Sequence, residues 1–280
     1  MSFYISLSGL KASQTDLSTI SNNVANVSST GFKKSKAEFG DIFAAAPMQT
    51  TNQVAGQGVR VQGVTQQFTQ GTLESTAKTL DLGIAGEGYF TVKGEDGTVS
   101  YTRNGAFSVD QDRFAVDTTG AKMQIFAVDP ATGTPTTPAA GATPANLVDL
   151  QIPTTLNNDP AGAQLNSVAV GKDGLVSAVY ADGSTVYLGK VAMASFNSQE
   201  GLRQEGDAHW TSTVASGAPT LGTANQGLFG AINSGMLERS NVDITDELVA
   251  LIAAQRNFQA NSKAIEAANT LTTTIVNLRT

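Results

Sequence analysis

The sequence predicts an α+β protein in which the N- and C-terminal helices pair as a coiled-coil-like layer and an antiparallel β middle forms one or two small β domains. Three observations predict this. The prolines all lie between residues 47 and 219, so both ends permit long helices and the middle favours turns. Apolar residues at both ends recur at steps of three, four or seven, as in amphipathic helices. In the middle, apolar and polar residues alternate, as in strands.

The N-terminal helix is predicted from an apolar heptad stripe. Its members are Phe3, Leu10, Leu17, Ile20, Val24 and Val27. We expect the helix to end at Thr30-Gly31, because glycine is favoured just after a helix C-cap. Only Lys11 and Asp16 are charged within residues 1–30, whereas a solvated helix face usually carries more charge. This face therefore suits burial against other subunits.

The β middle follows from period-two runs within 81–110 and 166–196. Four dipeptides flanked by strand-like runs are predicted tight turns: Asp96-Gly97, Asn104-Gly105, Asp173-Gly174 and Asp182-Gly183. Residues 129–165 carry most of the prolines and are expected to form an exposed loop or a connection to an outer module. Residues 36–70 are expected to be extended.

The C-terminal helix is predicted over residues 246–280, with Asn241 or Asp243 as its N-cap. Its apolar stripe consists of Leu248, Leu251, Ile252, Phe258, Ile265, Leu271, Ile275 and Leu278. One antiparallel helix pair leaves the far side of each stripe open, and burial of apolar surface favours further helices. The two stripes are therefore the predicted assembly interface, covered by the other end of the chain and by further copies.

The predicted organisation has four parts. Residues 1–35 with 240–280 form a terminal helical domain, and 36–70 form an extended linker region. Residues 71–125 with 195–239 form an inner β domain, and 126–194 a small outer β module. Candidate hinges between the helical and β layers are the glycines Gly31, Gly40, Gly56, Gly58 and Gly63.

Composition excludes several classes of function. The net charge of -7 argues against a nucleic-acid partner and against docking on an anionic membrane, because both need clustered Lys and Arg. No apolar run is long enough to span a bilayer. The absence of cysteine and the presence of one histidine, His209, exclude disulfides, thiolate chemistry, Cys-based zinc sites and two-His metal sites. We therefore expect no catalytic, cofactor or metal site, and an enzyme is a remote alternative.

Four stretches resemble a known family. SLSGLKASQTDLSTISNNVANVSSTGFKKSKAEFGDIF (6–43) resembles the N-terminal signature of the bacterial flagellar rod and hook family, and LERSNVDITDELVALIAAQRNFQANSKAIEAANTLTTTIVNLR (237–279) its C-terminal signature. TQGTLESTAKTLDLGIAGEGYFTV (69–92) and YTRNGAFSVD (101–110) resemble its inner β-domain motifs. The segments QQFTQGTL and AQRNFQANSKAI are similar to the hook members, although many of these carry a large outer domain that this chain cannot accommodate.

The resemblance implies a self-polymerising subunit of an axial tube in the bacterial flagellum, outside the cell. The hook reading implies a curved hollow tube that acts as a universal joint, transmitting torque from rod to filament. The rod alternative implies a distal drive-shaft subunit of the basal body. Implied partners are the flagellar export apparatus, the hook cap protein, and neighbouring rod and hook–filament junction proteins. Export without a cleavable signal peptide agrees with the start MSFYISLSGLKASQTDL, which lacks a basic first segment.

A third reading comes from a different class of protein. A monomeric β-rich binding module with a coiled-coil stalk would show the same periodicities. Sedimentation at increasing concentration separates the readings, because only hook and rod subunits should form long polymers. For these subunits we also expect disordered ends in the dilute monomer, since helices are stabilised mainly by packing.

Overall fold

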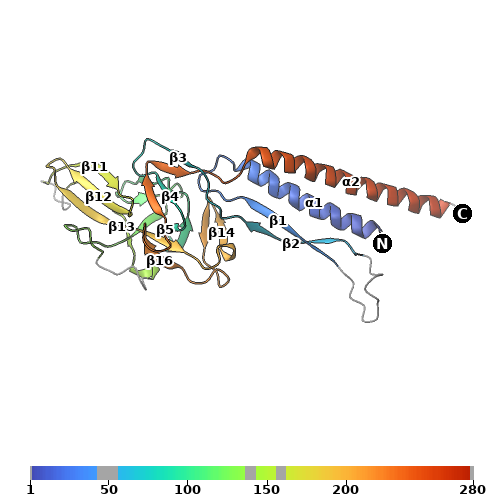
Figure 1. Cartoon of the computed structure of the whole chain (residues 1–280), viewed down its shortest axis with the longest axis horizontal. Coiled ribbons are helices and arrows are strands. Elements are labelled where there is room, and N and C mark those ends of the chain that lie inside the picture. Colours follow the sequence, from blue (N-terminus) through green and yellow to red (C-terminus); the bar gives the residue numbers. More distant parts are fainter. Residues whose placement is uncertain (1, 43–55, 136–142, 156–161, 278–280) are drawn as a thin grey trace. The chain divides into compact units, whose positions relative to one another are not determined.

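A computed structural model of the protein describes residues 2–42, 56–135, 143–155 and 162–277 (Figure 1). The chain divides into two compact units. The helical unit comprises residues 1–27, 34–67 and 242–280, and the β unit comprises residues 28–33 and 68–241. The predicted combination of terminal helices with an antiparallel β middle is confirmed.

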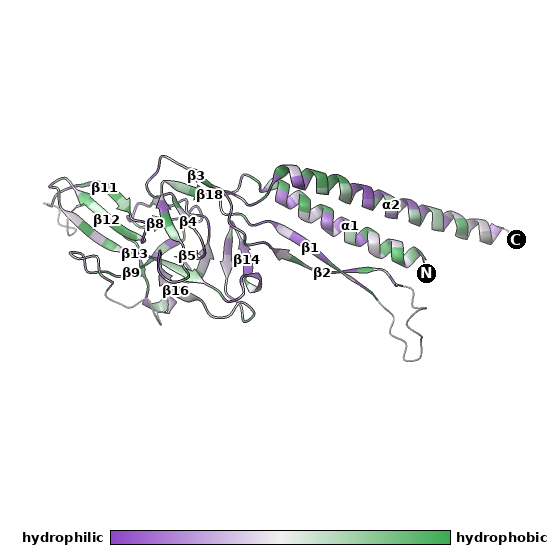
Figure 2. Ribbon diagram, viewed as in Figure 1, coloured by the Kyte–Doolittle hydropathy of each residue, from purple (hydrophilic) through white to green (hydrophobic). Residues whose placement is uncertain are grey.

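The helical unit contains α1 (Ser2–Ala25), α2 (Ile244–Asn277), β1 (Ser35–Asp41) and β2 (Val59–Gln66). The two helices run antiparallel, because Asn23 contacts Glu247 whereas Ser13, farther toward the N-terminus, contacts Asn261. Figure 2 shows that the apolar residues of α2 concentrate in its first turns.

Capping groups define where α2 begins. The Asp243 carboxylate accepts hydrogen bonds from the backbone N–H groups of Thr245, at 2.8 Å, and Asp246, at 3.4 Å. These bonds lower the pKa of Asp243 and satisfy two donors that the first helical turn leaves free. Of the two predicted N-caps, Asp243 is therefore the one used.

The predicted end of the first helix at Thr30-Gly31 is wrong, because α1 ends at Ala25. The residues that follow include Asn26, Ser28 and Ser29, whose side chains compete with the backbone for hydrogen bonds and favour turns. Gly31 adopts a left-handed φ of 70° after the helix, and a Cβ there would lie 2.7 Å from the Asn104 nitrogen. The glycine is required by the turn and by close packing.

An antiparallel hairpin accompanies the helices. β1 pairs with β2 from Ser35 opposite Gln66 to Asp41 opposite Val59, with one register shift after Glu38. The Ser8 hydroxyl of α1 accepts a hydrogen bond from Val59 N at 3.2 Å. The extended region predicted over 36–70 therefore contains a hairpin that contacts α1.

The β unit is built around a large sheet with the strand order β11-β12-β13-β9-β5-β6-β15-β14, in which every pair is antiparallel among the described residues. The strands, in this order, are β11 (Leu165–Val170), β12 (Leu175–Tyr180), β13 (Thr185–Ser195), β9 (Lys122–Phe126), β5 (Tyr89–Lys93), β6 (Val99–Thr102), β15 (His209–Thr211) and β14 (Arg203–Gly206). Four short strands join this sheet: β7 (Ser108–Val109), β8 (Ala115–Val116), β10 (Val148–Asp149) and β16 (Thr220–Thr223).

Smaller elements complete the β unit. β3 (Leu73–Ser75) pairs with β18 (Met236–Glu238), and β4 (Leu82–Ala85) pairs with β17 (Ala231–Ser234). Two 3₁₀ turns, η2 (Pro144–Asn146) and η4 (Gln199–Gly201), lie in connections. The first and last strands of the unit thus pair at the point where the chain enters and leaves it.

Three of the four predicted tight turns are confirmed. Gly97, Gly174 and Gly183 adopt positive φ angles between β5 and β6, β11 and β12, and β12 and β13. The turn predicted at Asn104-Gly105 is wrong, because β6 pairs with β5 and β15 and no hairpin follows it. A Cβ on Gly105 would lie 1.7 Å from the Leu82 carbonyl oxygen, so this glycine permits a close backbone approach.

Two apolar cores cover the sheet, and β13 contributes to both with period two. Val191 and Met193 join a cluster that includes Phe90 and Ile232. The alternate residues Ala192 and Ala194 join a second cluster, around Trp210, Tyr89, Tyr101 and Phe196. The predicted inner and outer β modules both contribute strands to this sheet, and their division stays a prediction.

Candidate assembly interface

The contact between α1 and α2 is made largely by small residues. Ala12 and Ala254 are buried, the latter with 1% of its surface exposed. A Cβ on Gly9 would lie 2.8 Å from the Asn261 Oδ1, and the Asn261 amide donates to the Ser13 hydroxyl at 3.4 Å. Such a contact lets the helices approach closely but buries little apolar area per residue.

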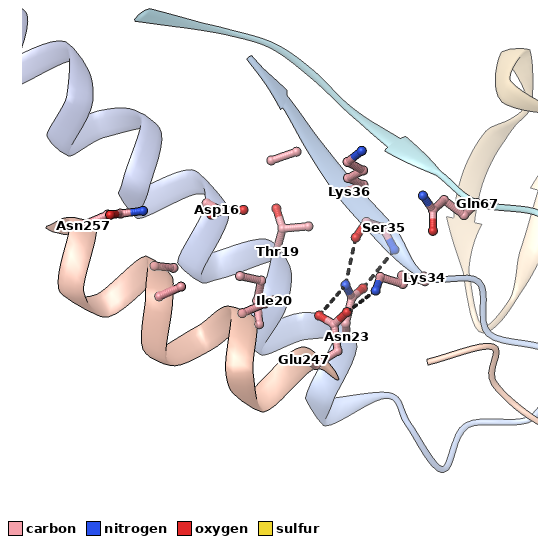
Figure 3. Close-up of a pocket in the computed structure, with 14 residues that line it drawn as sticks. Asp16, Thr19, Ile20, Asn23, Lys34, Ser35, Lys36, Gln67, Glu247 and Asn257 are labelled. Atoms are coloured by element: carbon pink, nitrogen blue, oxygen red, sulfur yellow. Dashed lines mark hydrogen bonds and ion pairs between the residues drawn. The ribbon is translucent and has the colours of Figure 1, made fainter. Parts of the chain in front are cut away.

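A polar junction joins the two helices to β1 (Figure 3). The Asn23 amide nitrogen donates to Ser35 O at 2.8 Å and to Glu247 Oε2 at 3.1 Å, and its oxygen accepts from Ser35 N at 2.9 Å. Lys34 forms an ion pair with the other oxygen of Glu247. Because Glu247 is only 2% exposed, these contacts provide the partners that a buried carboxylate requires.

A groove runs between α1, α2 and the hairpin, and we call it the Asp16 groove. It consists of two hollows of about 430 and 410 Å³ that share Asp16 and Asn257. Small residues line much of it: Gly9, Ala12, Ala250, Ala253 and Ala260. Burial and the nearby Glu247 raise the pKa of Asp16. Among the described residues, no ion pair reaches Asp16.

The residues of the predicted interface are covered to different degrees. Ile20 is buried within the helical unit. Partly buried are Leu10, Leu17, Val24, Val27, Leu251, Phe258 and Ile265. Phe3, Leu248, Ile252 and Leu271 are exposed, the last three at 45%, 51% and 65%. Ile275 belongs to α2, and Leu278 lies outside the described residues.

Sequence reasoning identified Ile252 but missed Val249 and Arg256, which extend a second face of α2. Val249 is 63% exposed, and with Thr245, Ile252 and Arg256 it follows steps of four, three and four. This is the spacing of a helix seam, and it was visible in the sequence. The missed residues Asn23 and Asp16 carried no such signal, because their roles depend on contacts between distant segments.

Many hydroxyl groups of the helices bond to their own backbone. Thr270, Thr272, Thr273 and Thr274 each donate to the carbonyl four residues earlier at 2.8–2.9 Å. Ser13, Thr15 and Thr19 of α1 do the same. A hydroxyl satisfied in this way loses less on leaving water, so these polar faces tolerate burial against another helix.

The candidate hinge glycines have different surroundings. A Cβ on Gly58, where φ is 114°, would lie 2.3 Å from the Ser8 hydroxyl oxygen, and one on Gly40 would lie 2.6 Å from Gln62 Nε2. Within the described part of the chain, no atom lies within 4 Å of a Cβ built on Gly56 or Gly63. Gly31 and Gly58 thus have backbone and packing reasons of their own, whereas the exposed Gln62 side chain beside Gly40 can move aside. A hinge role for the set stays a prediction.

The β unit holds a buried charge network at its entry. Glu238 is fully buried and accepts from Lys33 Nζ at 2.7 Å, Arg103 Nη1 at 3.1 Å and Gly71 N at 2.9 Å. Lys33 also donates to Thr69 O at 2.8 Å. Burial lowers the pKa of Lys33 despite the opposing charge of Glu238. One carboxylate therefore connects four segments of the unit.

The described residues contain no cluster of three or more His, Cys, Asp or Glu side chains that could hold a metal ion. His209 pairs with Asp117 at 2.6 Å in the interior of the β unit. No helix in the described part of the chain combines the length and apolar character that a membrane crossing needs.

Three family models match parts of the chain. Residues 3–33 match a flagella basal body rod protein model, and residues 83–178 match the D1 domain of flagellar hook protein FlgE/F/G. Residues 233–278 match the C-terminal model of the flagellar basal body rod FlgEFG proteins. The flagellar basal-body rod protein FlgG of Bacillus subtilis (strain 168) is 35% identical over 291 residues, covering 99% of this chain and 98% of that protein. The chain belongs to the flagellar rod and hook protein family.

Hook proteins of the family are similar over the whole chain as well. The flagellar hook protein FlgE of Escherichia coli (strain K12) is 29% identical over 415 aligned residues, covering 100% of both chains. The crystal structure of the Helicobacter pylori flagellar hook protein FlgE2 covers 65% of this chain and 44% of its own, at 14% identity and a TM-score of 0.24. Membership in this family makes the chain a structural component of the bacterial flagellum.

Proposed function

We propose that this protein is the structural subunit of the flagellar hook, polymerising into a curved hollow tube that transmits torque from rod to filament. The observation that carries the proposal is the exposed apolar surface of α2 in the single chain. Leu248, Val249 and Ile252 are 45–63% exposed although α2 already packs on α1. Burying such a row stabilises an assembly by roughly 25 cal/mol per Å² of apolar surface.

The remaining parts of the proposal follow from family membership. The helices of many copies line the channel and the β units lie outside them. The chain leaves the cell through the flagellar export apparatus without a cleavable signal peptide, and adds to the tip beneath a hook cap protein. It contacts rod and hook–filament junction proteins at the two ends of the tube. No nucleic acid, membrane insertion or cofactor takes part, and the protein is not an enzyme.

A second candidate, the distal rod subunit, is favoured by chain length. The alignment with the E. coli hook protein has 415 − 280 = 135 positions without a residue of this chain. The alignment with the B. subtilis rod protein has 291 positions and covers nearly all of both chains. A rod subunit would form a straight, rigid fibre.

Imaging of purified basal bodies separates the two functions. A tag inserted at the exposed β12–β13 turn, Asp182-Gly183, marks the subunit. If the protein is the hook subunit, we expect the label to lie along a curved segment between rod and filament. A label confined to the straight rod would reject the hook in favour of the drive shaft, and failure of the purified chain to polymerise at any concentration would reject both.

A further inference from the structure

The Asp16 groove offers a carboxylate that forms no ion pair with any cation among the described residues. Asp16 lies on α1 and Asn257 on α2, beside the first hollow (Figure 3). Lys34, a cation that lines this hollow, pairs with Glu247 instead. Lys36 lines the same hollow but makes no ion pair with Asp16. The raised pKa of Asp16, caused by burial and then by Glu247, agrees with a carboxylate that lacks a cation.

The groove has room for a long side chain and for a helix above it. Each hollow is more than ten times the roughly 30 Å³ that one water occupies in the liquid. Its exposed small lining residues, such as Ala253 and Ala260, permit a close approach of another backbone. A helix face that carries a cation next to a row of apolar residues would therefore complement this groove.

The outer face of α2 carries this combination. Val249, Ile252 and Arg256 lie one above the other at steps of three and four, and all three are exposed. Arg256 lies two residues beyond the buried Ala254, so it points about 200° around the helix from the face that packs on α1. Arg256 makes no ion pair within the described part of the chain.

We propose that the outer face of α2 in one copy docks into the Asp16 groove of a second copy, with the Arg256 guanidinium paired with the Asp16 carboxylate. The proposal rests on the proposed self-assembly and names its contact. A planar guanidinium can donate two parallel hydrogen bonds to a carboxylate, which fixes the register of the two helices as well as their charge balance. Val249 and Ile252 then cover the small residues of the groove.

The geometry requires two copies. Arg256 faces away from α1, which carries Asp16, so one chain cannot pair the two groups while α1 and α2 remain packed together. Each copy presents one outer face and one groove, which are different surfaces. Contacts of this head-to-tail kind do not close in pairs: they generate rings when the rotation between copies closes and open helical filaments when it does not.

Charge reversal tests the contact in full-length chains. We compare the unchanged protein with Asp16→Arg, with Arg256→Asp, with the double variant and with a 1:1 mixture of the single variants, scoring polymer by sedimentation and electron microscopy. Each single variant is expected to lose at least tenfold in polymer yield. The double variant and the mixture are expected to recover it, because each groove then meets an opposite charge on the neighbouring copy. Lys11→Asp, an exposed cation on α1, is the matched control and should polymerise like the unchanged chain.

The outcomes separate this contact from the proposed function. If the unchanged chain polymerises and the single variants do so equally well, the contact is wrong while self-assembly stands. If the single variants do not polymerise and their mixture does not polymerise either, the proposed contact is again wrong, because complementary charges did not restore polymerisation. If the unchanged chain does not polymerise under any condition, the proposed function itself fails.

Discussion

Glu238 is a residue whose removal would leave two cations without a carboxylate partner in the interior of the β unit. Lys33 and Arg103 are almost fully buried, and Glu238 is the carboxylate that contacts both. Breaking a buried ion pair by removing one partner typically costs about 3–5 kcal/mol. We therefore expect Glu238→Gln to lower the free energy of unfolding by about this amount, measured by calorimetry as a fall in Tm.

A matched control for this substitution lies on the neighbouring strand. Glu74 of β3 pairs with Arg239, but both side chains are exposed. Because exposed ion pairs contribute little, Glu74→Gln should change the Tm only slightly. Equal shifts for the two variants would contradict the role assigned to Glu238.

The pair of His209 and Asp117 makes the stability of the β unit depend on pH. Burial lowers the pKa of His209, but the hydrogen bond and charge of Asp117 outweigh it and raise the pKa above its ordinary value of 6.5. The stabilisation is therefore fully present below pH 6.5 and is lost as the pH rises through the higher pKa of the folded state. The difference in Tm between the unchanged chain and His209→Gln should be larger at about pH 5.5 than at about pH 9, as measured by thermal unfolding. An equal difference in Tm at both pH values would refute the stabilising role of the His209–Asp117 pair.

At the scale of elements, the small residues between α1 and α2 control how the helices pack. Ala254 has 1% of its surface exposed, so a larger side chain would meet α1. Overpacking of this kind typically costs about 1–3 kcal/mol. We expect Ala254→Leu to lower the helical signal and the cooperativity of the circular-dichroism melt. Ala264→Leu, at an exposed position of the same helix, should leave both unchanged, and an identical effect of the two would show that only helix propensity is involved.

Local sequence signals predicted most of the helices, strands and turns. Contacts between segments that are distant in sequence could not be predicted from such signals. The Asp243 cap, the glycine turns at 97, 174 and 183, and the two helices follow from short-range patterns. The close approaches at Gly31 and Gly105 depend on packing against Asn104 and Leu82, which are distant in sequence. The same holds for the candidate interface: apolar periodicity identified Leu248 and Ile252, but the Asp16 groove exists only once α1, α2 and the hairpin have come together.

At the scale of the whole molecule, the two units differ in how much apolar surface stabilises them. The β unit has two cores that contain large side chains such as Trp210 and Phe90. The helical unit relies on alanines, Gly9, a few larger residues such as Ile20, and the polar junction at Asn23. Since helices gain most of their stability from packing, α1 and α2 should open more easily than the sheet.

Hydrogen exchange on the dilute chain measures this difference. Amides in residues 1–30 and 245–280 are expected to exchange fast, while those of β5, β9 and β13 stay protected because their strands are buried in the sheet. Polymerisation should slow exchange in both terminal segments, since the exposed face of α2 then meets another copy. A dilute chain with equal protection in its helices and its sheet would mean that one copy already stabilises its helices, and the exposed apolar row would lose its explanation as an assembly surface.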